Sequence, residues 1–334
     1  MNDEFVPGHL LKLQALERPG DPLVSCIVPV YNEAQNIVPL LQTLHAILGG
    51  LNLRHELIVV DDGSSDDSVA LVRAEIGALP LTLVELSRNF GKEIALTAGI
   101  DHAKGDVAVL IDGDFQHPPE LIPSFLEHWR NGYDMVYSVR ESRVGETLAK
   151  RWFTRVFYTL LNIGATLKIP ENTQDFRVLD RRILDALRAM PERNRFMKGL
   201  YHWVGFTRLA VVSRTDERRA GDSSFNLWRL ISLALTGLTS FSNVPLRVWS
   251  VIGGIISLTS IFYALVVVLD TLLYGNDLRG WPTLTVGVMF LGGVQLLSIG
   301  VLGEYIGRIF NEVKMRPHYF VNRVSGNRED GKSS

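Results

Sequence analysis

Cysteine and surplus charge are both scarce in this chain of 334 residues, and each scarcity excludes a class of protein. Cys26 is the only cysteine, so an intrachain disulfide cannot form and nothing indicates a secreted, disulfide-stabilised fold. The 34 basic and 36 acidic side chains give a net charge of −2. This balance excludes a disordered polyelectrolyte and argues against nucleic acid as the main ligand, because phosphate neutralisation needs a basic excess.

Several well-known nucleotide and catalytic motifs are also missing. No GxGxxG follows the first predicted strand, and no GxxxxGK followed by Ser or Thr occurs, so neither a dinucleotide-binding fold nor a P-loop ATPase is supported. The chain has no GxSxG elbow. Its eight histidines and one cysteine do not have the spacing of zinc ligands. The chemistry must therefore be sought in other side chains.

Hydrophobic residues are concentrated in two uncharged runs near the C-terminus, Val248–Leu269 and Gly280–Gly303, of 22 and 24 residues. A bilayer core about 30 Å thick needs about 20 helical residues, so both runs predict transmembrane helices. The alternative is a pair of buried core helices. Basic residues such as Arg247, Arg308 and Lys314 lie on the outer flanks, which predicts that the connecting loop is outside and that both termini are cytoplasmic.

The soluble part alternates short apolar runs with helical patterns. The predicted strands are 23–30, 56–60, 81–86, 107–111 and 135–139, and the predicted helices are 34–48, 65–76, 92–103 and 120–131. The strands are apolar on both faces, as is typical of a buried parallel sheet. Alternation of such strands with helices predicts a right-handed, doubly wound α/β domain.

Two further segments are rich in basic and aromatic residues at helical spacing. They lie near 147–167 and within 226–243, and their composition favours helices on a membrane surface over ordinary amphipathic packing on the sheet. The expected domain order is a mobile arm (1–21), the α/β domain (22–225), an interfacial helix (226–243), a two-helix membrane part (244–308) and a cytoplasmic tail (309–334).

Polar side chains follow the first four predicted strands, in the runs 29–33, 61–66, 88–92 and 112–116. Ligands of doubly wound sheets bind beyond the carboxyl ends of the strands, so these runs predict one binding site. Asp112, Asp114 and Gln116 supply two carboxylates and an amide oxygen at i, i+2 and i+4. Such a set suits Mg²⁺ or Mn²⁺ that takes its other ligands from water and substrate phosphates, the alternative being a solvated acidic turn.

These motifs together resemble the family 2 glycosyltransferases with a GT-A fold. The resemblance is carried by PVYNE, VDDGSSD, RNFGKE, DGDFQHPPE, QDFRVLDRR and RRAGDSS, and by LGEYIGRIFNEVKMRPHYFV after the apolar runs. It extends from about residue 23 to residue 321. Within the family it points to the polyisoprenyl-phosphate glycosyltransferases, the branch that includes bactoprenol glucosyltransferases and dolichol-phosphate mannose synthases.

The resemblance implies roles for individual residues. The donor-binding set is Pro29, Tyr31, Glu33, Asp61, Asp62, Lys92, Asp112 and Gly113, and the metal set is Asp112, Asp114 and Gln116. The catalytic set is Asp114, Arg140, Asp175 and Arg218, and the acceptor-phosphate set is Arg140, Arg177, Arg218 and Arg219. Ser224 stands where the family usually has Lys, so we assign it no binding role.

The implied reaction is inverting transfer of a hexose onto undecaprenyl phosphate at the cytoplasmic face of the inner membrane, by a homo-oligomer such as a tetramer. The first choice of donor is UDP-glucose; GDP-mannose, UDP-GlcNAc, UDP-galactose and a UDP-aminoarabinose derivative stay open. A phosphate oxygen is largely deprotonated near pH 7, so Asp175 either orients the acceptor, takes a residual proton or simply pairs with Arg177.

Three rival interpretations share some of these features. A processive polysaccharide synthase is disfavoured because the chain has no QxxRW segment. A transporter is disfavoured because the two apolar runs carry no charge that would line a polar path. A non-catalytic nucleotide-sugar sensor would share the donor pocket but would not need the acidic pair together with the acceptor arginines.

Overall fold

The computed structural model describes residues 18–140, 173–193, 195–213 and 280–326, together with 249, 252–256, 258–259, 262–263, 265–266, 269 and 272–273. A sheet and the helices packed on it form one compact unit, and the described part of 249–315 belongs to a second unit. Residues 1–17 of the expected arm (1–21) and the expected surface helices near 147–167 and 226–243 lie outside the described residues. The described end of the arm contacts the domain, since Arg18 donates to Asp134 Oδ1 at 3.2 Å.

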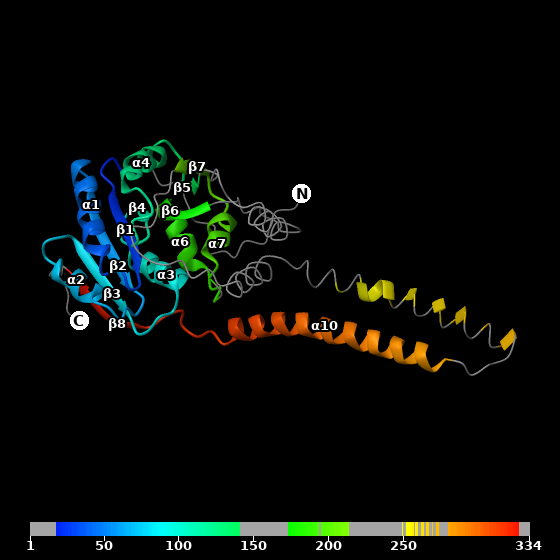
Figure 1. The fold of residues 1–334 in the computed structure, drawn as a ribbon. Coiled ribbons are helices and arrows are strands. Elements are labelled where there is room, and N and C mark those ends of the chain that lie inside the picture. Colours follow the sequence, from blue (N-terminus) through cyan, green and yellow to red (C-terminus); the bar gives the residue numbers. More distant parts are fainter. Residues whose placement is uncertain are drawn as a thin grey trace, which may run out of the picture. The chain divides into compact units, whose positions relative to one another are not determined.

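An eight-stranded sheet forms the centre of the first unit (Figure 1), in the order β7-β5-β6-β4-β1-β2-β3-β8. The strands are β1 (Leu23–Val30), β2 (Arg54–Asp61), β3 (Leu81–Leu86), β4 (Val107–Leu110), β5 (Met135–Arg140), β6 (Thr173–Asp180), β7 (Arg208–Ser213) and β8 (Val321–Gly326). The pairs formed among β1, β2, β3 and β4 are parallel. Their interiors are mostly apolar and buried, as is typical of parallel strands covered on both faces.

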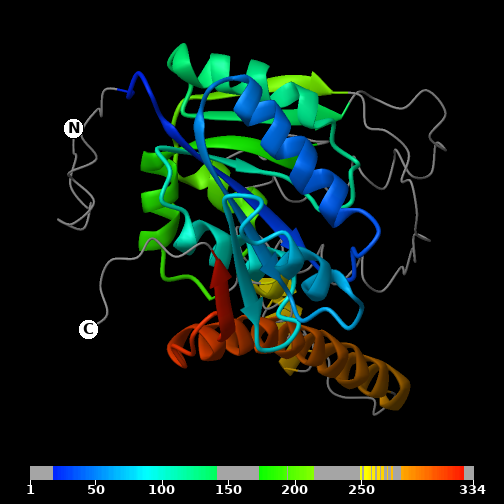
Figure 2. The same ribbon diagram turned by 90° about the vertical axis from the view of Figure 1, so that its left-hand side faces the viewer.

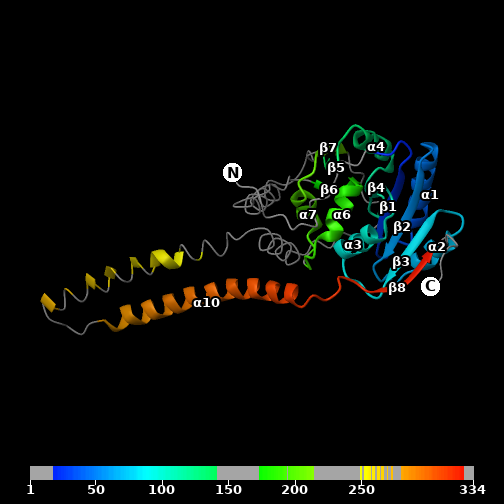
Figure 3. The same ribbon diagram turned by 180° about the vertical axis from the view of Figure 1, so that it is seen from behind.

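Helices cover both faces of the sheet. They are α1 (Ile37–Gly50), α2 (Ser68–Ala74), α3 (Lys92–His102), a 3₁₀ turn η1 (Pro119–Leu121), α4 (Ile122–Arg130), α6 (Arg181–Ala189) and α7 (Met197–Trp203). Alternate residues of β1, such as Val24 and Cys26, share one core with α1 and α4. In Figure 2, α1 lies in front of the sheet. Ile27 points to the opposite face, where a Cβ on Gly99 of α3 would overlap its side chain. Figure 3 shows α1 and α3 on opposite sides of the sheet.

The parallel half of the sheet agrees with the sequence analysis, while the rest corrects it. The five predicted strands and four predicted helices are confirmed within a few residues. The sheet is mixed, however, because β6 runs antiparallel to β4 and β5, and β8 runs antiparallel to β3. Polar residues such as Gln174, Asp175 and Arg177 interrupt the apolar pattern of β6, so its sequence did not predict a strand.

The chain that follows the long C-terminal helix returns to the sheet as β8. Val324 pairs with Val84, and the Ser87 N–H donates to the Phe320 carbonyl oxygen at 2.9 Å. The Tyr319 hydroxyl donates to Asp101 Oδ2 at 2.8 Å. This part of the expected tail is therefore an ordered edge strand of the sheet.

The second unit contains α10 (Trp281–Val313), a helix of 33 residues. At 1.5 Å per residue it is about 50 Å long, more than the roughly 30 Å of a bilayer core. Its segment Gly287–Val313 is long and apolar enough to cross a membrane. It overlaps the second predicted span but continues ten residues beyond Gly303. The first predicted span is described only in helical pieces, of which Ile252–Ile256 is the longest, so the two-helix hairpin stays a prediction.

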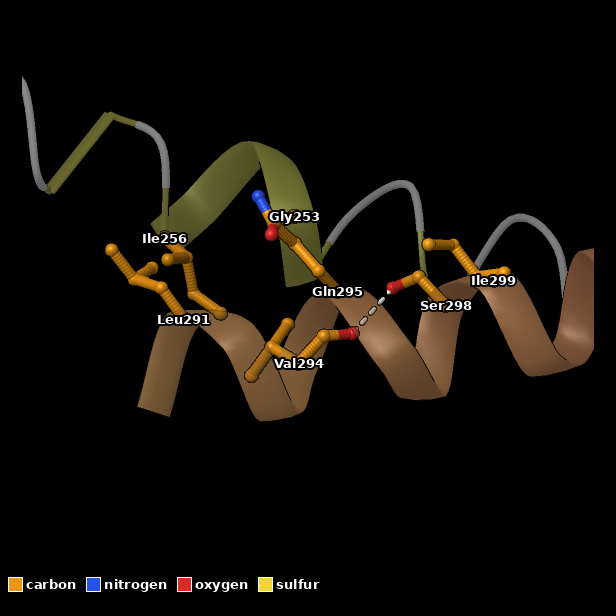
Figure 4. A pocket seen from close by; sticks show the side chains of 7 residues that line it. All are labelled: Gly253, Ile256, Leu291, Val294, Gln295, Ser298 and Ile299. Atoms are coloured by element: carbon orange, nitrogen blue, oxygen red, sulfur yellow. Dashed lines mark hydrogen bonds between the residues drawn. The ribbon is translucent and has the colours of Figure 1, made fainter. Parts of the chain in front are cut away.

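A cavity of about 610 Å³ lies in this second unit, beside α10 (Figure 4). Its lining residues are Gly253, Ile256, Leu291, Val294, Gln295, Ser298 and Ile299. The Ser298 hydroxyl donates to the Val294 carbonyl oxygen at 2.9 Å, one turn earlier. Such a bond satisfies a hydroxyl inside an apolar helix.

Candidate active site

The register between β4 and β6 places two predicted site residues side by side. Leu110 of β4 is paired with Arg177 of antiparallel β6, so Asp175 comes level with position 112 just beyond the end of β4. The helix α3 starts in the same place, because Lys92, its first residue, follows the loop after β3. Three elements that are far apart in the sequence therefore meet at the carboxyl ends of the parallel strands.

Lys92 joins the two carboxylates that this register brings together. Its Nζ lies 2.7 Å from Asp112 Oδ1 and 2.6 Å from Asp175 Oδ2, and it also donates to Asp112 Oδ2 at 2.8 Å. The Lys92 side chain is 42% exposed, so the ion pairs add only modestly to stability. Their electrostatic effect is nevertheless clear. Burial alone would raise the pKa of Asp112, but the neighbouring ammonium holds it below its usual range.

Asp175 has two further cationic neighbours. Lys198 Nζ of α7 lies 3.7 Å from its Oδ1, and Arg177 Nη2 lies 3.9 Å from the same atom. Burial would raise the pKa of Asp175, but Lys92, then Lys198 and Arg177, lower it well below its ordinary value. A carboxylate held ionised in this way is a weak base.

Arg177, expected at the acceptor phosphate, is only 1% exposed. Its Nη2 donates to the Gln174 carbonyl oxygen at 2.6 Å, and its guanidinium lies 3.9 Å from the centre of the Tyr201 ring. The structure therefore gives Arg177 partners inside the protein, through which it supports the segment that carries Asp175. Contact of its guanidinium with a phosphate stays a prediction.

Lys198 and Glu93 belong to this cluster and were missed by the sequence analysis. Glu93 Oε2 accepts a hydrogen bond from the N–H of Met197, the first residue of α7, at 3.2 Å. This contact ties α3 to α7 and lies beside the positive end of a helix dipole. Burial, with a smaller contribution from Asp175, raises the pKa of Glu93 to about 7. Glu93 stands within the RNFGKE motif and could have been noticed, whereas Lys198 has no sequence signal.

The DGDFQ run forms a tight turn after β4. Asp114 Oδ1 accepts a hydrogen bond from the Gln116 N–H at 3.1 Å, and Phe115 has a positive φ of 57°. A Cβ on Gly113 would lie 3.4 Å from the Pro29 carbonyl oxygen, so the ends of β1 and β4 approach closely here. The buried His117 places Nε2 3.6 Å from Asp112 Oδ2 and stacks on Phe176, in agreement with a structural role.

The donor set of this turn fits a divalent cation by its chemistry. Two carboxylates and an amide oxygen are hard ligands, which Mg²⁺ and Mn²⁺ prefer. No group of three His, Cys, Asp or Glu side chains within the described part of the chain is arranged to hold a metal without other ligands. Asp112, Asp114 and Gln116 would therefore need phosphate oxygens or water to complete a coordination shell.

The remaining donor-side residues are tied to one another by hydrogen bonds. Asp62 accepts from the N–H groups of Phe90 and Gly91 at 2.7 and 2.9 Å, which fixes the loop leading to Lys92. Asp61 accepts from the Gly63 and Ser64 N–H groups in its own turn. Burial raises the pKa of both carboxyls, against the effect of these hydrogen bonds.

The loop after β1 completes this edge of the sheet. Tyr31 is 49% exposed, and Glu33 Oε2 accepts from Asn36 Nδ2 at 2.9 Å. Asn32 Oδ1 accepts from the Ser65 N–H at 2.8 Å, which links the loop to the one after β2. The predicted donor residues are thus brought to one edge, where Tyr31 offers an exposed ring for a planar base.

Several predicted acceptor-side residues cannot be placed. Arg140 ends β5, where it pairs with Ser213, but its side chain lies outside the described residues. Arg218, Arg219 and Ser224 also lie outside them. Of the acceptor-phosphate set the structure therefore positions Arg177 alone.

Comparison with known proteins shows extensive similarity. Residues 25–188 match the model of the family described as glycosyl transferase family 2. A prophage-derived bactoprenol glucosyl transferase of Shigella flexneri is 44% identical over 301 residues, which cover 90% of this chain and 97% of that protein. A glycosyltransferase of Synechocystis sp., itself uncharacterized, is 45% identical over 304 residues, or 91% and 96% of the two chains. Among solved structures, glucosyl-3-phosphoglycerate synthase from Mycobacterium tuberculosis has a TM-score of 0.44 and 19% identity, covering 72% of this chain and 83% of that one.

Proposed function

Because this chain belongs to glycosyl transferase family 2 and is a glycosyltransferase, we propose that it transfers glucose from UDP-glucose to a polyprenyl phosphate. The observation that carries the proposal is the 44% identity to a bactoprenol glucosyl transferase, which extends over 97% of that protein. The soluble domain is then a GT-A domain, and undecaprenyl phosphate is the expected acceptor. Other hexose donors would use the same chemistry.

The donor lies beyond the carboxyl ends of β1, β2 and β4 in this proposal. Tyr31 and the buried carboxyls of Asp61 and Asp62 form the nucleoside side of the pocket. Asp112, Asp114 and Gln116 are the residues that would hold Mg²⁺ or Mn²⁺, with phosphate oxygens of the donor completing its ligands. When bound, this cation stabilises the charge that develops on the leaving nucleotide.

An oxygen of the acceptor phosphate attacks the anomeric carbon and inverts it, while the bond from that carbon to the diphosphate oxygen breaks and UDP leaves. Its second pKa is about 6, so near pH 7 the attacking oxygen is already largely ionised and needs no strong base. The cations around Asp175 lower its pKa, which favours an orienting role over proton abstraction. Lys198 and the predicted Arg140, Arg218 and Arg219 reduce the repulsion between the two anions.

The membrane part brings the enzyme to its lipid. A polyprenyl chain stays in the bilayer because each exposed CH₂ costs about 0.8 kcal/mol. We propose that α10 and the preceding apolar run form a two-helix hairpin, with the catalytic domain and both termini in the cytoplasm. The segments near 147–167 and 226–243 then lie at the headgroup level. A homo-oligomer is part of the same proposal.

The proposal is tested with the purified full-length protein in detergent, undecaprenyl phosphate, Mn²⁺ and a panel of radiolabelled nucleotide-sugars. UDP-glucose is expected to give the most labelled glycolipid. If UDP-GlcNAc, UDP-galactose or GDP-mannose gave the most product, the proposed donor would change, but the proposed reaction type would stand. No labelled lipid from any donor would overturn the proposal and favour a nucleotide-sugar sensor.

A further inference from the structure

The Lys92 ammonium occupies a cation position between two carboxylates of different strands. It contacts both oxygens of Asp112, at 2.7 and 2.8 Å, and Oδ2 of Asp175 at 2.6 Å. Asp112 is also a predicted metal ligand. A divalent cation bound to Asp112 would lie close to an ammonium that bridges both of its oxygens, and the two positive charges would repel each other.

We propose that Lys92 is a built-in counter-ion of the donor site, which occupies Asp112 and Asp175 before the donor arrives and so makes divalent-cation binding depend on the nucleotide diphosphate. The inference rests on the proposed function, because it takes Asp112 as a ligand of the donor's metal. It adds a regulation of that site: the metal and the nucleotide bind as a pair.

The backbone around Lys92 is fixed, while its side chain can move. The preceding residue, Gly91, donates its N–H to Asp62 at 2.9 Å and has a φ of 99°, a conformation that favours glycine. Its carbonyl oxygen accepts the hydrogen bond of Ala95, which fixes the start of α3. The Lys92 side chain itself is 42% exposed and has four rotatable bonds. It can therefore leave Asp112 without any change in the fold.

A bound diphosphate offers the Lys92 ammonium an alternative anionic partner. Without nucleotide, Lys92 neutralises a pair of carboxylates that would otherwise attract a cation strongly. A bound diphosphate provides anionic oxygens for the same ammonium, and Asp112 is then released to the metal. Divalent-cation affinity should consequently be low for the protein alone and high in the presence of UDP.

Lys198 provides a matched control within the same cluster. Its Nζ lies 3.7 Å from Asp175 Oδ1 and donates to the Thr173 carbonyl oxygen at 3.2 Å. Within the described residues Lys198 forms its ion pair with Asp175, whereas Lys92 also pairs with Asp112. Removing its charge tests whether any nearby lysine lowers the affinity for Mn²⁺, or whether only a lysine bound to Asp112 does so.

The experiment is Mn²⁺ titration of the full-length protein in detergent, followed by the electron paramagnetic resonance signal of free Mn²⁺, with and without UDP. Lys92→Met is expected to bind Mn²⁺ without UDP about tenfold more tightly than the parent, equivalent to about 1.4 kcal/mol, and to lose most of the UDP effect. Lys92→Arg, which keeps the charge, should bind as weakly as the parent. Lys198→Met should change the affinity by less than about threefold, since its charge is more distant.

The outcomes separate this inference from the proposed function. UDP-dependent Mn²⁺ binding in the parent, with unchanged or weaker nucleotide-free binding in Lys92→Met, overturns the role of Lys92 and leaves the metal site intact. No Mn²⁺ binding under any condition overturns this inference and the Mn²⁺ site together, while glycolipid formation tests the reaction separately. Lys92→Gln, checked by its thermal unfolding transition, repeats the test if the Met variant does not fold.

Discussion

The two halves of the sheet contribute differently to the site. The parallel strands β1 to β4 carry the predicted donor residues at their ends and are held by hydrogen bonds between neighbouring loops. The mixed half, β5 to β7, contributes Asp175 from an antiparallel strand and Lys198 from α7. The predicted donor side is therefore built by loops at the ends of parallel strands, whereas the predicted acceptor side is built by side chains from later elements.

The largest effect should come from the donor half. Asp112→Asn removes a predicted metal ligand and a partner of Lys92, and Asp114→Ala removes the second carboxylate of the predicted set. We expect each to lower kcat by about a thousandfold or more, since a metal's charge stabilisation is worth several kcal/mol. Glycolipid formation measures the loss, and the thermal transition verifies folding. Asp67→Asn, which changes an exposed carboxylate in a neighbouring loop, is the control and should retain activity. An active Asp114→Ala variant would contradict the assignment of Asp114 as a metal ligand.

The acceptor half should respond less strongly. Asp175→Asn keeps the shape of the side chain but removes the charge that orients Lys92 and Lys198, so we expect kcat/KM to fall about a hundredfold. Because the pKa of Asp175 is lowered, its protonation should add no step to the parent's pH profile between pH 6 and 8. Asp185→Asn, on the outer surface of α6, is the control. A kcat that rises through an apparent pKa in this range, and loses that step in Asp175→Asn, would instead identify Asp175 as a base.

Glu93 tests whether the two halves are coupled, because it joins α3 to α7. In the folded state the pKa of Glu93 is about 7, above that of an ordinary glutamate, so the folded state binds the proton more tightly. The contribution of Glu93 to the unfolding free energy therefore falls as pH rises from about 4.5 to 7. Relative to the parent, Glu93→Gln should therefore gain about 1 to 3 kcal/mol in unfolding free energy between pH 5 and pH 8. Thermal unfolding at the two pH values measures this, and the exposed Glu120→Gln should show no such trend. Parallel pH curves for Glu93→Gln and the parent would contradict the assignment.

The smallest effect should come from the edge of the donor half. Tyr319→Phe removes one hydrogen bond to Asp101 and should cost about 1 kcal/mol or less. A double-mutant cycle with Asp101→Asn isolates this contact, because partners in direct contact give non-additive changes. Strictly additive changes in the unfolding free energy would show that the bond does not anchor the segment before β8.

Sequence analysis predicted the first half of the fold well and the second half poorly. Buried parallel strands such as Leu23–Val30 are continuous apolar runs, and their polar ends are therefore conspicuous. In β6 the polar residues of the site lie inside the strand, so its sequence lacks the continuous apolar run that would predict a strand. β8 is an exposed edge strand, with residues such as Asn322 and Arg323, and only its pairing with β3 identifies it as a strand.

The candidate site divides in the same way. The motif residues Asp112 and Asp175 were predicted, but their bridge through Lys92 depends on the register of β4 and β6, which no local pattern encodes. Lys198 reaches the site because α7 packs beside β6. Contacts of this kind arise from tertiary packing and have no spacing rule.

The anomeric configuration of the product most directly tests the central claim, direct transfer of glucose from the bound donor to the lipid phosphate. UDP-glucose carries an α-linked sugar, and direct attack by the lipid phosphate predicts a β-linked glucosyl phospholipid, which NMR of the extracted product identifies. An α-linked product would mean retention of configuration, which a single in-line displacement cannot give, and would contradict direct attack by a phosphate oriented beside Asp175.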